Sequence, residues 1–140
     1  MEPKQFHYKA TEILTADPAK IILMLYDGAI SFMYQASSAA ESKQYIERAN
    51  KISRVNSILL ELLSSLDFEK GGEIAKNLRE IYVFLVKELL KADHQNDAEL
   101  IQRCAQVLEI IRDGWKEVVS QASQKSTKAN KSVPKIPDFA

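Results

Sequence analysis

The chain has 140 residues, a length that suits one domain with a core of its own. Its 19 basic and 19 acidic side chains give a formal net charge of zero, so no bulk field would draw it to nucleic acid or to an acidic membrane. The single cysteine, Cys104, excludes an intramolecular disulfide and is expected to be a small core residue in a reducing compartment. The N-terminus has no signal-peptide pattern, and the apolar run over residues 21–26 is too short to cross a bilayer. These features predict a soluble, cytoplasmic protein with no stable membrane insertion.

The first sixteen residues are expected to form a flexible N-terminal arm. They contain apolar side chains without a clean helical period, and the arm is a possible cap over a binding groove on the folded domain. The apolar residues of the arm are Phe6, Tyr8, Ile13 and Leu14.

The first helix is expected over residues 17–40. Asp17 can cap free backbone N–H groups, and Pro18 suits the first helical position because its missing N–H is not needed there. Thr15 is the competing cap. The polar residues that follow Ala40 make the first turn.

This helix carries more apolar surface than a bundle helix needs. On a wheel with about 100° per residue, an ordinary core stripe lies within about 60° of Ile22 and includes Tyr26. Ile21 and Phe32 widen the stripe on one side, and two aliphatic residues widen it on the other, to about 200°. Met24 lies on the face that should be polar.

Three further helices follow after short connections. Gly71 and Gly72 separate the second helix from the third, and Asn96 with Glu99 resembles a capping box that starts the fourth. In each helix apolar residues recur at steps of three and four. The expected helices span residues 45–66, 72–92 and 97–122.

The second and third helices show the same apolar excess more mildly, through residues that include Leu60, Phe84 and Leu90. Asn56 falls on the apolar side of the second helix, where a satisfied buried amide would fix the helix register. Tyr82 lies near the core stripe of the third helix, and its hydroxyl, like that of Tyr26, is expected at the rim of the core. Trp115 is expected in the core.

Four helices of about twenty residues with short loops favour an all-α fold, an antiparallel up-down four-helix bundle over residues 17–122. Residues 123–140 form a lysine-rich tail with almost no apolar residue before Val133, which we expect to be disordered. A contiguous surplus of apolar side chains usually marks a binding surface, and an amphipathic helix is the natural ligand. Three alternatives remain: the first helix is central, the N-terminal segment covers it, or it forms a homodimer interface.

Catalysis is not expected from these residues. His7 lies in the arm and His94 in a polar loop, so neither joins a nucleophile in a recognisable arrangement. The chain has no Walker loop, dinucleotide glycine pattern, zinc spacing or Glu-x-x-His pair. We therefore expect no catalytic residue, no cofactor and no metal, and we favour partner binding. The runner-up is a self-associating structural bundle whose surplus surface is a dimer interface.

Four stretches in order carry a resemblance to a known family. They are TADPAKIILMLYDGAISF with Tyr8 ahead of it, SLDFEKGGEIAKNLREIY, ADHQNDAELI and RDGWKEV. Over roughly residues 6–120 the chain resembles the flagellar secretion chaperones of the FliS family. Asp17 stands where the family usually has Ser or Thr, which is a harmless change at a cap. The lysine-rich tail with its closing IPDF is outside the resemblance.

The resemblance implies a cytoplasmic helical bundle that binds the C-terminal helical segment of newly made flagellin, prevents early polymerisation and helps delivery to the flagellar export gate. It also implies that the N-terminal arm can cover part of the binding surface and that the free protein can dimerise. We expect the flagellin groove to be formed by residues of the first and third helices, namely Ile21, Met24, Tyr26, Phe32 and Tyr82.

Overall fold

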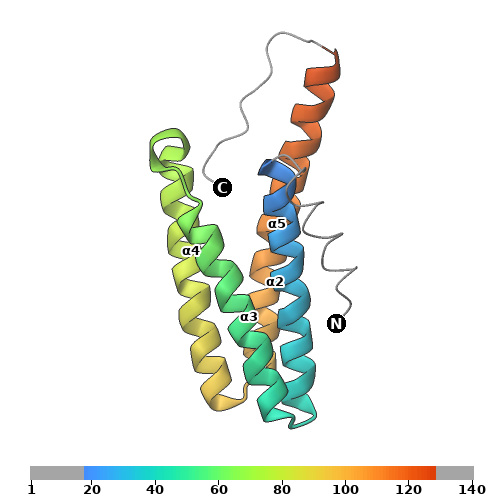
Figure 1. Cartoon of the computed structure of the whole chain (residues 1–140), viewed down its shortest axis with the longest axis vertical. Helices are drawn as coiled ribbons and strands as arrows, with labels where there is room; N and C mark the ends of the chain where they lie inside the picture. Colours follow the sequence, from blue (N-terminus) through green and yellow to red (C-terminus); the bar gives the residue numbers. More distant parts are fainter. Residues whose placement is uncertain (1–17, 129–140) are drawn as a thin grey trace, which may run out of the picture.

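The computed structural model describes residues 18–128, with side chains through residue 121, and the expectations for the arm and for residues 129–140 lie outside that range. The described chain is an antiparallel four-helix bundle without strands, as the sequence predicts (Figure 1). The helices are α2 (Pro18–Glu41), α3 (Tyr45–Ser64), α4 (Phe68–Gln95) and α5 (Ala98–Lys128).

Three helices differ from their predicted bounds, and the smallest difference is in α3, which ends at Ser64 rather than at residue 66. Helix α2 is described from Pro18 onward, and both candidate caps lie outside the described residues. Helix α4 begins at Phe68 rather than at residue 72, because the Asp67 side chain accepts hydrogen bonds from the backbone N–H groups of residues 69 and 70. At the position of the predicted break, α4 has a kink, where Gly72 has a φ of 53° and a ψ of −126°. Helix α5 continues through Lys128, past its expected end at residue 122.

The turn between α4 and α5 uses a different cap from the predicted one. Asn96 adopts a left-handed conformation with a φ of 52° and ends α4. Asp97 caps α5 instead, because its side chain accepts a 3.0 Å hydrogen bond from the N–H of Leu100. The expectation that Asn96 caps the fourth helix is therefore wrong.

Hydrogen bonds connect this turn to the ends of α2 and α3. We call this end of the bundle the closed end. Arg48 of α3 donates from Nε to Asp93 and from Nη1 to Asn96, both over 2.7 Å. The amide of Asn96 in turn donates to the carbonyl oxygen of Ala40 at the end of α2, over 3.2 Å. Three helix ends thus share one hydrogen-bond network, which fixes how α2, α3 and α4 meet.

The core runs along the bundle axis and is almost entirely apolar. Met33 of α2, Leu59 of α3, Leu85 of α4 and Leu108 of α5 are all fully buried. Cys104 is buried among them as expected, and burial with the nearby charge of Glu88 raises the pKa of its thiol to about 12. Its burial excludes a reactive surface thiol at this position.

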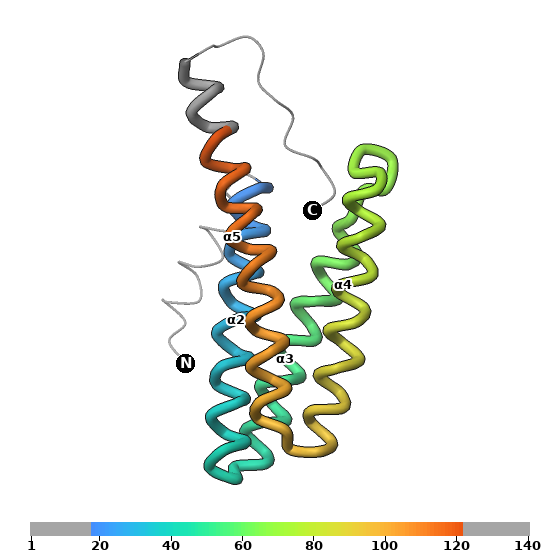
Figure 2. Tube along the Cα trace, turned by 180° about the vertical axis from the view of Figure 1, so that it is seen from behind, coloured from blue at the N-terminus to red at the C-terminus, as the bar shows by residue number. Residues whose placement is uncertain are grey.

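Helices α2 and α4 are packed differently around this core. Helix α2 lies against both α3 and α5 along most of its length, whereas α4 makes smaller contacts with the same two helices. Figure 2 shows that the first part of α4 diverges from α5, while the two helices meet at the turn near residue 96. Trp115 is buried on the α2 side of α5, where its indole N–H donates to the carbonyl oxygen of Ala19 over 3.2 Å.

Candidate partner-binding surface

The structure leaves the predicted groove residues of α2 only partly accessible. Ile21 and Met24 are half-buried and are not among the side chains that pack against the core cluster. Phe32 does pack against the core, and its ring lies 5.4 Å from Nζ of Lys51 and 5.6 Å from the guanidinium of Arg54. Contact of these three residues with a partner stays a prediction.

The two tyrosines of the predicted groove are core residues. Tyr26 of α2 and Tyr82 of α4 are fully buried, and their hydroxyl oxygens are 2.6 Å apart in a mutual hydrogen bond. The expectation that these hydroxyls lie at the rim is wrong, because each satisfies the other inside the core. Burial raises the pKa of both hydroxyls above the usual tyrosine value. In this conformation neither ring is accessible to a partner.

Exposed large apolar side chains gather instead on α4. Ile74, Phe84 and Leu90 are 51%, 52% and 56% exposed. Phe84 and Leu90 lie on opposite sides of the core-facing stripe of α4, since a helix turns by about 100° per residue. The sequence indicated Phe84 and Leu90 as a mild surplus, and both are about half exposed. Helix α4 therefore has apolar flanks on both sides.

One flank of α4 faces α5. Glu88 lies on the same side of α4 as Phe84, and its charge acts on the Cys104 thiol of α5. On α5, Glu109 and Arg112 bond to Tyr34 and Asp27 of α2, so the opposite flank of α5 faces α4. The apolar side chains of these two facing flanks form what we call the α4–α5 surface: Ile74, Ile81, Phe84, Val107, Ile111 and Val118.

Residues of the α4–α5 surface match in height along the bundle. Ile74 and Val118 each lie about 20 residues from the turn between the helices, which is roughly 30 Å of helix. Ile81 and Ile111 match at roughly 20 Å from that turn. The half-buried Ile81 and Ile111 pack against the core, and the more exposed Ile74 and Val118 border them. These side chains therefore lie at matching levels on the two facing flanks, where α4 and α5 diverge.

The other flank of α4 faces α3. Ile58 of α3 approaches Gly28 and so marks the side of α3 that faces α2, which leaves the opposite side for α4. Leu60 on that side is 55% exposed. Asn56 lies beside it, and its Oδ1 is buried without a hydrogen-bond partner among the described residues, contrary to the expected satisfied amide. The side chains of this second strip, the α3–α4 surface, are Leu60, Leu63, Val83, Val86 and Leu90.

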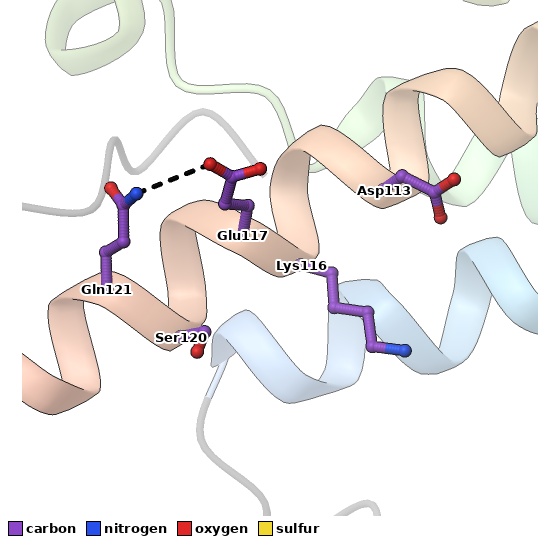
Figure 3. A pocket seen from close by; sticks show the side chains of 5 residues that line it. All are labelled: Asp113, Lys116, Glu117, Ser120 and Gln121. Carbon is purple, nitrogen blue, oxygen red and sulfur yellow. Dashed lines mark hydrogen bonds between the residues drawn. The ribbon is translucent and has the colours of Figure 1, made fainter.

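A polar hollow lies elsewhere, on one face of α5. It has a volume of about 370 Å³ and is lined by Asp113, Lys116, Glu117, Ser120 and Gln121 (Figure 3). Glu117 accepts a 3.4 Å hydrogen bond from Gln121, whereas Lys116 extends toward α2. Side chains of both charges and one hydroxyl on a single helix do not form a nucleophile with its base. Among residues 18–121, no group of three or more His, Cys, Asp or Glu side chains could hold a metal ion.

The described helices also contain no segment long and apolar enough to cross a membrane. The exposed apolar side chains on the flanks of α4 form the candidate partner-binding surface, because patches of this kind usually mark protein contacts.

Comparisons with known proteins show a family and several relatives with similar sequences. The family described as "Flagellar protein FliS" matches residues 1–122. The flagellar secretion chaperone FliS of Salmonella typhimurium is 37% identical over 112 residues, which cover 79% of this chain and 83% of the relative. Proteins of the same name from Vibrio cholerae and Campylobacter jejuni are 30% and 31% identical, over 77% and 79% of this chain and 79% and 87% of the relatives.

Proposed function

Because the chain belongs to the FliS family of flagellar proteins, we propose that it is a cytoplasmic flagellar secretion chaperone whose client is the C-terminal helical segment of unassembled flagellin. The observation that best supports this proposal is the pair of apolar strips on the two sides of α4. An amphipathic client helix would cover such a strip with its apolar face and leave its polar face in water.

The exposed apolar side chains would contribute to binding of a flexible client. Full burial of a large aliphatic or aromatic side chain contributes about 1.5–3 kcal/mol, so covering the exposed half of Phe84 or Leu90 contributes about 1 kcal/mol each. A client that folds on binding loses ordering entropy, which offsets part of this gain and keeps the affinity moderate. Moderate affinity suits a carrier that must release its client for export.

We expect one client to contact both strips. They share α4, so a chain that crosses α4 can lie first on the α3–α4 surface and then on the α4–α5 surface. A client held in this way cannot offer the same apolar face to another flagellin subunit. Premature polymerisation would be blocked by occupation of that face, and the complex would present the subunit to the export apparatus.

The proposal is tested with the C-terminal peptide of the cognate flagellin, by calorimetry and circular dichroism. We expect binding of one peptide per chain with a gain of helix. Phe84→Asp should weaken binding by at least tenfold, because a charge replaces half-buried apolar contact. Absence of binding at tens of micromolar protein would remove the flagellin assignment.

Ile46→Asp is the matched control, because Ile46 is 80% exposed on α3 and belongs to neither strip. It should leave peptide affinity unchanged. Sedimentation of the free protein and of the mixture tests the competing explanation that the strips form a dimer interface. A tight dimer that the peptide cannot dissociate, and that Phe84→Asp converts to monomer, would favour a structural bundle over a chaperone.

A further inference from the structure

We propose that this chain carries its own competitor for the client site: its C-terminal segment, residues 133–139, docks on the α4–α5 surface. The regulatory part of this inference rests on the proposed function, whereas the docking itself does not. The segment reads VPKIPDF and lies beyond residue 122, where the family match ends. Neither the fold nor the proposed client site accounts for its apolar residues.

The sequence of the segment favours an extended form with one apolar face. Pro134 and Pro137 exclude a regular helix and bias the residues before them to extended conformations. A polyproline II conformation has three residues per turn, so the apolar residues spaced by three would share one face. These residues are Val133, Ile136 and Phe139.

The α4–α5 surface offers a strip of matching shape. It lies on two antiparallel helices that diverge (Figure 2). Ile74 and Val118 lie about 20 residues from the turn between these helices, and Phe84 and Val107 lie nearer to that turn. From Val133 to Phe139 an extended chain covers about 19 Å at roughly 3.1 Å per residue. The levels of Ile74 and Phe84 differ by about 15 Å along α4, at 1.5 Å per residue.

The point where α5 ends puts the segment within reach. Val118 lies about 15 Å back along α5 from Lys128. The chain between Lys128 and Val133 spans at most about 17 Å when extended, so Val133 can return to the level of Val118. A flagellin helix on the same strip would have to displace the segment.

Docking through apolar contacts can be distinguished from electrostatic contacts of a basic tail by its dependence on salt. The segment has one lysine and one aspartate, Lys135 and Asp138, so its net charge is zero. Salt screens interactions between exposed charges but does not weaken apolar contact in the same way. Docking should therefore persist when the salt concentration is raised.

The test uses the full chain with a nitroxide label on Ala140→Cys, observed by NMR without any client. Cys104 does not compete for the label, because it is buried and the pKa of its thiol is raised to about 12. We expect the label to broaden the signals of Ile74, Phe84 and Val118 but not those of Ile46. Equal broadening on all faces, or none, would overturn the docking.

Two double variants of the C-terminal tail separate apolar docking from charge. Ile136→Ser with Phe139→Ser should abolish the selective broadening, whereas Lys131→Ser with Lys135→Ser should retain it. The apolar variant should also bind the flagellin peptide about threefold tighter if the segment occupies about two-thirds of the molecules. Equal affinity would overturn the competition. Lack of any peptide binding would contradict the proposed function and leave the label experiment as the test of docking.

Discussion

Helices α2 and α4 share one core but differ in what they leave uncovered. Helix α2 has the wider apolar stripe in the sequence, yet α3 and α5 cover its flanks, and even the half-buried Phe32 packs against the core beneath Lys51 and Arg54. Helix α4 has the more ordinary pattern, yet Phe84 and Leu90 remain about half exposed. The amount of apolar surface that a helix leaves exposed thus depends on how closely its neighbours approach, and not only on the width of its apolar stripe.

The two ends of the bundle are also packed differently. At the closed end, the network from Arg48 to Asn96 holds α4 against its neighbours. At the other end, α4 is kinked at Gly72 and diverges from α5 (Figure 2). Exposed apolar side chains and core residues therefore lie on the same helix, on different faces.

The largest expected effect on stability is found by comparing two single variants, one that shortens a core residue of α2 and one that shortens a flank residue of α4. Met33→Ala should lower the free energy of unfolding by about 2–5 kcal/mol, because it leaves a cavity in the buried core. Phe84→Ala should lower it by less than about 1 kcal/mol, since half of the ring is already in water. Urea denaturation followed by circular dichroism measures both values.

Peptide affinity should show the reverse order. Phe84→Ala should weaken client binding about fivefold, whereas Met33→Ala should change it little while the protein stays folded. A loss of stability from Phe84→Ala as large as that from Met33→Ala would contradict the comparison, because it would make the α4 flank part of the core.

Much of the fold follows from the sequence because it depends on local rules. The apolar period places four helices, and short loops make neighbours antiparallel. Trp115 and Cys104 were predicted in the core because they lie within clear stripes, and both are buried there. The start of α4 was missed because the glycine pair was taken as a full break, whereas Asp67 caps a turn before it.

The candidate site could not be predicted as well, because it depends on distances between helices. A wheel gives directions around one helix but not how far the next helix lies. Tyr26 and Tyr82 were assigned to a groove, although their hydroxyls meet across the core at 2.6 Å. Only a structure shows that two polar groups on different helices satisfy each other.

An effect of intermediate size is expected for the hydrogen-bonded pair of Tyr26 in α2 and Tyr82 in α4. Tyr82→Phe should lower the free energy of unfolding by about 1–3 kcal/mol, because it leaves the Tyr26 hydroxyl buried without its partner. The double variant Tyr26→Phe with Tyr82→Phe should lose less than either single variant, since both polar groups are then gone. A double-mutant cycle by urea denaturation measures this coupling, and additive losses would show that the hydroxyls do not depend on each other.

The smallest expected effect concerns Asn56, on the flank of α3 that faces α4. Its buried Oδ1 has no described hydrogen-bond partner, so Asn56→Leu should raise the free energy of unfolding by about 1 kcal/mol. Asn56→Asp is the opposing control and should be destabilising, because it places a charge at the same half-buried position. If Oδ1 accepts a hydrogen bond from the client, Asn56→Leu should also weaken peptide binding while it stabilises the free protein. A stabilised variant with unchanged affinity would limit the role of Asn56 to the bundle, and a destabilised one would show that the amide already has a partner in solution.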